Sequence, residues 1–120
     1  MSFNWKEYLN LALVLQGLYP QGFVQEAAFR CSVSRAYYAA FCYARNHARH
    51  NLGFNPTYTG RDHGLVRDHF RTWGMTNVAS KLDSLYQWRG MCDYKDTVSN
   101  ISIMVKSAII EAREIIRSLP

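Results

Sequence analysis

The segment Arg89-Gly-Met-Cys-Asp-Tyr94 carries the residues with the clearest potential for chemistry on a phosphate. Arg89 occupies a position where the apolar stripe of a helix would continue with a hydrophobic residue, so its guanidinium must find acceptors. Asp93 follows four residues later, on the same helical face, where it can pair with Arg89. The pattern fits either a buried structural ion pair or an arginine kept for bidentate phosphate binding, with the Tyr94 hydroxyl alongside. Arg89, Asp93 and Tyr94 are therefore the candidate catalytic residues.

An arginine and two adjacent tyrosines stand together in the run Ser34-Arg-Ala-Tyr-Tyr38. Tyr38 shares a helical face with the serine that opens the run, so we expect its ring to point inward. A buried hydroxyl needs a partner, which Arg89 or Asp93 on a facing helix can supply. Plain aromatic packing with satisfied hydroxyls explains the run equally well. Arg35 and Tyr38 are candidates for binding RNA or a nucleotide.

The run Arg45-Asn-His-Ala-Arg-His50 reads as Arg-x4-His. Five residues of a continuous helix rotate the second side chain by about 140° from the first, so both reach one pocket only if the helix ends between them. As a solvated basic end of the helix, the run would still attract phosphate. His63, on the apolar face of a short helix, is more typical of a core histidine than of a catalyst. The candidate RNA- or nucleotide-binding residues are Arg35, Tyr38, Arg45, His50 and His63.

Five helices must position these side chains. Apolar residues recur at intervals of three and four along most of the chain, and Pro and Gly mark the breaks. Asn4 and Glu7 have the spacing of a capping box at the first helix. A loop at 53–60 concentrates Gly, Pro, Asn and Thr. The predicted helices span residues 5–19, 23–52, 61–73, 76–92 and 97–118.

Each predicted helix has one apolar stripe. Small residues beside the long stripe, at Ala36, Ala39 and Ala40, allow another helix to approach closely. The stripe of the long helix contains Ala27, Cys31, Ser34, Tyr38, Phe41, Arg45 and Ala48. The three later stripes contain His63, Val66, Phe70 and Trp73, then Val78, Leu82, Leu85 and Arg89, then Val98, Ile101, Val105, Ala108, Ala112, Ile115 and Leu119.

Composition limits the possible function classes. The chain has 120 residues, 48% of them hydrophobic and 19% charged, as expected for one folded domain covering residues 1–120. Its 14 Lys and Arg against 9 Asp and Glu give a net charge of +5, which favours phosphate-bearing partners. Three scattered cysteines, no metal-site spacing, no signal-like start and no membrane-length apolar run indicate a cytoplasmic protein, for which we expect no metal and no cofactor.

Taken in order, the motifs resemble those of the HEPN family, especially its small stand-alone members. The matching segments begin at Trp5-Lys-Glu-Tyr-Leu, Glu26-Ala, Ser34-Arg-Ala-Tyr-Tyr, His63-Gly-Leu and Leu85-Tyr-Gln-Trp-Arg. The resemblance implies an all-α, antiparallel up-and-down bundle that forms a homodimer with the arginine motif near the cleft. It also implies RNA-related work, as a metal-independent endoribonuclease or beside a nucleotidyltransferase antitoxin. The chain departs from the Arg-x4-6-His motif, because no histidine follows Arg89 within six residues.

Three functions are compatible with these observations. The first is a dimeric domain that binds RNA or a nucleotide and works with a nucleotidyltransferase in a toxin-antitoxin or defence-like pair. The second is a metal-independent endoribonuclease toxin in which Tyr94 or His63 replaces the missing histidine. The third is a structural module in which Arg89 and Asp93 lock the bundle. The rich aromatic content predicts a homodimer, with the long helix around Ala36, Ala39 and Ala40 at its interface.

Overall fold

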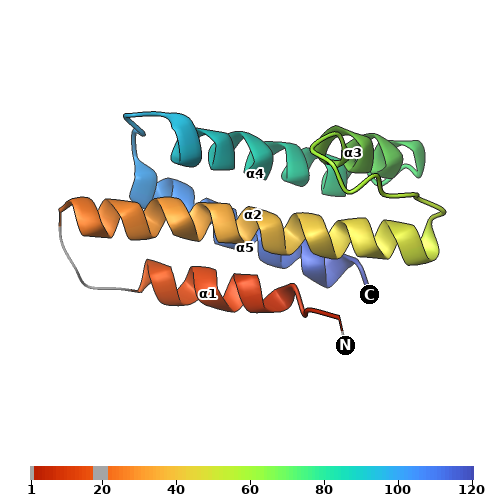
Figure 1. The fold of residues 1–120 in the computed structure, drawn as a ribbon, viewed down its shortest axis with the longest axis horizontal. Coiled ribbons are helices and arrows are strands. Elements are labelled where there is room, and N and C mark those ends of the chain that lie inside the picture. The colour runs from red at the N-terminus through yellow and green to blue at the C-terminus, as the bar shows by residue number, and fades with distance from the viewer. Residues whose placement is uncertain (1, 18–21) are drawn as a thin grey trace.

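The computed structural model describes residues 2–17 and 22–120, and these residues form five helices and no strand. This confirms the predicted all-α bundle. The helices are α1 (Lys6–Gln16), α2 (Phe23–Asn51), α3 (Asp62–Thr72), α4 (Thr76–Tyr94) and α5 (Ile101–Ser118). In Figure 1, α1 and α4 run antiparallel to α2, α5 runs antiparallel to α4, and both chain ends lie at the end of the bundle where α2 finishes.

Helix α2 is the axis of the bundle. Its 29 residues span about 43 Å at 1.5 Å per residue, which matches the molecule's longest extent of 45 Å. All four other helices pack against it, and Ala36, Ala39 and Ala40 are completely buried there. The interface predicted for these alanines is therefore wrong: helices of the same chain already cover them. Small side chains at these positions let α1, α4 and α5 approach α2 closely.

The buried face of α2 differs from the predicted stripe. Ala27 and Cys31 are exposed, whereas Ser32 is buried and its hydroxyl donates to the Ala12 carbonyl oxygen of α1 at 2.7 Å. Tyr37 is 1% exposed, while Tyr38, predicted to point inward, is only partly buried. The reason is that α2 is covered from several sides, so its buried face is wider than one stripe and is set by where α1 and α4 pack.

The ends of the first and third helices also differ from expectation. The Asn4 side chain accepts from the Lys6 amide at 3.1 Å rather than from the Glu7 amide, and the Glu7 carboxylate binds the Asn10 side chain instead. The predicted capping box is therefore absent. Residues 18 and 19, predicted as the end of this helix, lie outside the described residues. Trp73 is 54% exposed because α3 ends at Thr72, before the tryptophan can join its buried face.

The last two helices each differ from the prediction at one end. Helix α4 continues to Tyr94, so the whole arginine motif is helical. Helix α5 begins at Ile101 rather than 97, because Asn100 has a left-handed backbone (φ +55°) that an α-helix cannot contain. The amides of Ile103 and Met104 donate to the Asn100 carbonyl oxygen at 3.1 Å, which starts the helix at this point.

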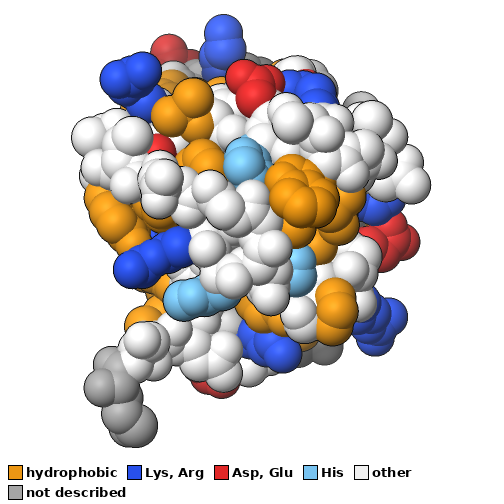
Figure 2. Space-filling view, turned by 90° about the vertical axis from the view of Figure 1, so that its right-hand side faces the viewer, with side chains coloured by type: hydrophobic (Ala, Val, Ile, Leu, Met, Phe, Trp, Pro, Cys, Tyr) orange, Lys and Arg blue, Asp and Glu red, His pale blue; other side chains and the backbone are white. Residues whose placement is uncertain are grey.

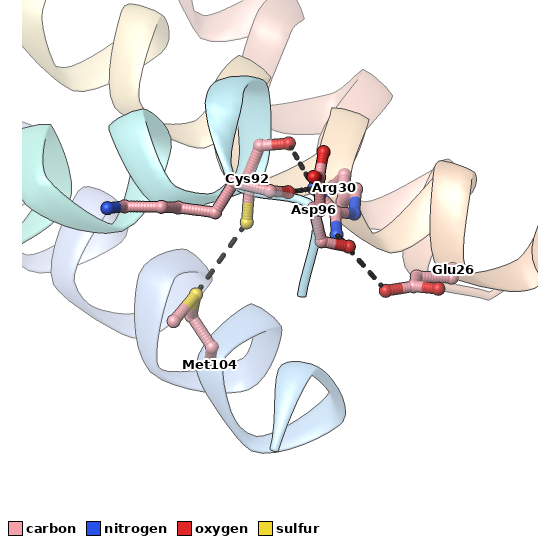
Figure 3. A network of polar contacts seen from close by, with 6 residues as sticks. Glu26, Arg30, Cys92, Asp96 and Met104 are labelled. Carbon is pink, nitrogen blue, oxygen red and sulfur yellow. Dashed lines mark hydrogen bonds and ion pairs between the residues drawn. The ribbon is translucent and has the colours of Figure 1, made fainter. Parts of the chain in front are cut away.

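Arg30 of α2 holds the end of α4 in place (Figure 3). One terminal nitrogen donates to the carbonyl oxygens of Cys92 and Lys95, at 3.0 and 2.6 Å, and the other donates to that of Asp96 at 3.1 Å. Glu26, one turn earlier, pairs with the same guanidinium at 3.3 Å. Carbonyls at a helix C-terminus lack partners within the helix, so Arg30 supplies donors that α4 itself cannot.

Candidate functional site

A hollow of about 470 Å³ opens between the start of α1, the middle of α2 and the loop that leads into α3. Five Trp, Tyr and Phe side chains line it, together with two arginines, a histidine and one aspartate. It is lined by Trp5, Tyr8, Arg35, Tyr38, Phe41, Cys42, Arg45, Tyr58, Thr59, Gly60, Asp62 and His63. The volume lies within the range of small-molecule pockets, about 300 to 1,000 Å³. Four of the predicted binding residues meet here: Arg35, Tyr38, Arg45 and His63.

Arg35 lies between two tyrosine rings of this hollow. Its guanidinium carbon is 4.8 Å from the ring centroid of Tyr8 and 5.3 Å from that of Tyr38. Its hydrogen-bond acceptor is the neutral hydroxyl of Ser34, at 3.2 Å. Among the described residues no carboxylate forms a direct ion pair with Arg35, so the two rings are the main contacts of this cation in the hollow.

Arg45 repeats this arrangement about one helical turn beyond Phe41. Its guanidinium carbon is 5.7 Å from the ring centroid of Trp5 and 5.3 Å from that of Tyr58. Its hydrogen bonds go to the neutral side-chain oxygen of Asn46, at 3.1 and 3.2 Å. Within the described ranges Arg45 forms no direct ion pair either, although its charge acts on the Asp62 carboxylate of the same hollow. The hollow therefore presents two aromatic-bound guanidinium groups that can receive an anion.

Asp62 shapes the loop side of the hollow. One carboxylate oxygen accepts from the Thr57 amide and hydroxyl at 3.0 and 2.7 Å, and the other accepts from the Tyr58 amide at 2.8 Å. Burial alone would raise the pKa of Asp62, but the Thr57 and Tyr58 hydrogen bonds and the charge of Arg45 together lower it. The carboxylate is therefore ionised, and both of its oxygens accept hydrogen bonds. It also holds Tyr58 in a left-handed backbone conformation (φ +56°) against Arg45.

Tyr37 and His63 form a hydrogen-bonded pair at the inner wall. The Tyr37 hydroxyl lies 2.5 Å from Nδ1 of His63. Burial raises the pKa of Tyr37 by more than the neighbouring Arg67 and Arg89 lower it, so the hydroxyl keeps its proton. Burial lowers the pKa of His63, and Arg89 and Arg67 lower it further. The buried hydroxyl has no other acceptor among the described residues, so its proton is assigned to the bond with Nδ1, which places the proton of the neutral imidazole on Nε2.

The pH dependence of stability should report this neutral histidine. The unfolded chain protonates His63 near its ordinary pKa of 6.5, whereas the folded chain does so at lower pH. The stabilisation is therefore complete above that value and is lost as the pH falls through the folded pKa. We expect the melting temperature to fall between pH 7 and 5, and His63→Gln to reduce that fall. The exposed His50→Gln should retain it; identical slopes for wild type and His63→Gln would contradict the assignment.

Arg89 lies deeper, between α2 and α4. It is 8% exposed and pairs with Asp93 at 3.5 Å, as the spacing predicted. Burial alone would lower the pKa of Arg89, but Tyr38 and Asp93 raise it, so the group stays charged. Its guanidinium lies 5.0 to 6.0 Å from the ring centroids of four tyrosines, and its Nε is buried without a hydrogen-bond partner among the described residues. The four rings belong to Tyr37, Tyr38, Tyr86 and Tyr94.

The predicted catalytic trio is thus close in space but uneven in accessibility. Tyr94 is 78% exposed at the end of α4, while Arg89 is buried. Asp93 also accepts a hydrogen bond from the Ser34 hydroxyl at 3.5 Å. None of the three residues lines the hollow described above. Their geometry fits an ion pair within α4, linked to α2 through the Ser34 hydroxyl, better than a solvent-facing catalytic centre.

His50 is separated from Arg45, as the helical geometry predicted. Because α2 continues through Asn51, the two side chains leave the helix in different directions. His50 lines a second hollow, of about 330 Å³, at the end of the bundle. The Arg-x4-His spacing in α2 therefore does not assemble one pocket.

Sequence reasoning missed several residues that shape the site. Arg67 on α3 lies 4.7 Å from the Tyr86 ring centroid, which the Arg89 guanidinium also approaches at 5.0 Å, and it pairs with Asp83 at 3.8 Å. Asp62 carried a usable signal, because an Asp after a Thr- and Gly-rich loop is typical of a helix start. Tyr86 carried no such signal, since its role depends on the packing of α3 against α4.

Comparisons with protein-family models, with curated proteins and with solved structures give no significant match to this chain. Within residues 2–17 and 22–120, no helix combines the length and apolar character required to cross a bilayer. In the same part of the chain, no group of three or more His, Cys, Asp or Glu side chains is arranged to hold a metal ion.

Proposed function

We propose that this protein binds single-stranded RNA or a nucleotide in the hollow between α1, α2 and the α3 loop. The observation that carries the proposal is the repeated arrangement of an arginine between two aromatic rings, at Arg35 and at Arg45, with no carboxylate paired to either among the described residues. Aromatic faces stack on bases whatever their sequence, and guanidinium groups bind phosphate. The net charge of +5 would assist the approach of a polyanion.

The histidine in the hollow supports binding over cleavage. Metal-independent RNA cleavage needs a group that removes the proton of the 2′-hydroxyl. The basic nitrogen of neutral His63 is Nδ1, which already accepts from Tyr37. The remaining Nε2–H donates, so it suits hydrogen bonding to a phosphate or base rather than proton abstraction. Cleavage by Arg89 and Tyr94 remains the alternative.

The resemblance to HEPN proteins also suggests RNA or a nucleotide as the ligand. The motif order that suggests it runs from Trp5 to Tyr94 and so includes residues of the hollow. Assembly as a homodimer and association with a nucleotidyltransferase, in a toxin-antitoxin or defence-like pair, are predictions from that resemblance. Light scattering would test the dimer: a mass of about 14 kDa at tens of micromolar, the mass of one chain, would contradict it.

Calorimetric titration with uridine monophosphate and a short oligouridine tests the binding site. We expect Arg35→Ala and Arg45→Ala each to weaken binding about tenfold, because each removes charge-assisted hydrogen bonds to phosphate. Lys106→Ala is the matched control, since it removes one positive charge from an exposed position on α5 outside the hollow. Equal affinity in wild type and both arginine variants would refute the site. RNA cleavage in the presence of chelator, abolished by Arg89→Ala, would favour the nuclease alternative.

A further inference from the structure

Two hollows adjoin at Trp5, which lines both of them. The second hollow lies at the end of the bundle shown in Figure 2, where histidine, Lys and Arg side chains are interspersed with hydrophobic ones. It is lined by Phe3, Asn4, Trp5, Tyr43, Asn46, His47, His50, Asn51 and Pro120. No Asp or Glu side chain is among these residues. Like the first hollow, the second combines aromatic rings with polar side chains, but neither an arginine nor a counterpart of Asp62 lines it.

Three aromatic rings cluster at the boundary between the hollows, where Phe3 also lies 5.3 Å from Tyr8 between ring centroids. Trp5 contacts Tyr8 of the first hollow at 5.4 Å between ring centroids and Phe3 of the second at 4.9 Å, both edge to face. Along α2, Arg45 of the first hollow donates to Asn46 of the second. The two hollows are therefore adjacent parts of one surface, with Trp5 as the shared wall.

The second hollow also has a positive group at its edge. The Lys6 ammonium lies 5.4 Å from the ring centroid of Tyr43, and Lys6 itself is exposed. His50 is exposed on the same side, and the Asn51 side chain is anchored to the His47 carbonyl oxygen at 3.2 Å. A base between Phe3 and Tyr43 would meet donors from His50, and the phosphate joining it to a base in the first hollow would lie near Trp5 and Arg45.

We propose that the two hollows bind two successive nucleotides of a single strand, with Trp5 between the bases. This inference rests on the proposed function and specifies its ligand: a dinucleotide or longer single strand rather than a free mononucleotide. Stacking in the second hollow supplies the gain in affinity, because each base stacked on an aromatic side chain contributes independently of sequence. A duplex does not fit this arrangement, since its bases are already stacked and paired.

The test compares uridine monophosphate with the 5′-phosphorylated dinucleotide of uridine by calorimetry. We expect the dinucleotide to bind about tenfold more tightly. Phe3→Ala and His50→Ala change exposed side chains of the second hollow and are expected to reduce this ratio to below about threefold. Lys106→Ala should leave the ratio at the wild-type value. A duplex RNA of the same length as a single-stranded competitor should compete poorly.

Each result bears on one of the two proposals. Equal affinity for the two ligands, or an unchanged ratio in both Phe3→Ala and His50→Ala, would overturn the two-nucleotide track while leaving the first hollow as a mononucleotide site. Duplex RNA that competes as well as the single strand would also overturn the track. Binding of neither ligand would refute the proposed function itself, and this inference with it.

Discussion

Replacing Arg89 with alanine is expected to lower the free energy of unfolding by about 3 kcal/mol, one of the two largest effects predicted for this protein. The substitution removes a side chain that is 8% exposed and is surrounded by four tyrosine rings. It leaves a cavity and removes favourable cation–π contacts. The lost pairing with Asp93 adds less, because that carboxylate is partly exposed and water can solvate it. Urea unfolding followed by circular dichroism measures the change.

Arg89→Met separates packing from charge. Methionine fills much of the same volume and carries no charge that must be buried, while the wild-type Nε is buried without a partner among the described residues. We therefore expect Arg89→Met to lower the free energy of unfolding by only about 1 kcal/mol or less. If the methionine variant is as unstable as the alanine variant, the ion pair with Asp93 matters more than the geometry suggests.

The same methionine variant tests the nuclease alternative. It should remain folded, and because Arg89 does not line the hollow, its affinity for oligouridine should stay within about twofold of wild type. A large loss of binding in a folded Arg89→Met protein would show that the arginine motif itself contacts the ligand. The structural interpretation of the Arg89–Asp93 pair would then be wrong.

Replacing Asp62 with alanine is the second large effect, with an expected loss of about 2 to 4 kcal/mol. The carboxylate accepts three hydrogen bonds, and its removal leaves the Thr57 and Tyr58 amides without their acceptor. Because the loop carries Tyr58 against Arg45, nucleotide binding should weaken as well. Asp62→Asn keeps one acceptor oxygen, but its NH2 group would face a hydrogen-bond donor. We therefore expect a loss of stability smaller than that of Asp62→Ala. Asp68→Ala is the control, since Asp68 forms only an exposed pair with Arg71.

The effect of Asp62 has a defined pH window. Its folded pKa lies below the ordinary value of 3.8, so its contribution is complete above that pH and is lost as the pH falls through the folded pKa. The stability difference between wild type and Asp62→Ala should therefore be constant from pH 8 to about 5 and shrink in stronger acid. A difference that vanishes already at pH 6 would show that the carboxylate is not held as described.

The local sequence was sufficient to predict the helices and one key pair. Periodicity at three and four residues depends only on neighbours along the chain, so it predicted five helices and the loop at 53–60. The Arg89–Asp93 pair was predictable for the same reason, because four residues separate the two side chains within one helix. The predicted capping box is absent, because the Lys6 amide donates to the Asn4 side chain while the Glu7 amide donates to the Asn4 backbone carbonyl oxygen.

The composition of the site was decided by tertiary packing. Tyr37 and Tyr38 are adjacent and chemically identical, and only the placement of α4 and α3 buries the first and leaves the second on the hollow. Arg35 and Arg45 lie on one helix, but the rings that enclose them come from α1, from α2 itself and from the loop before α3. Contacts between different helices and loops depend on how whole helices pack, which a pattern confined to one helix does not encode.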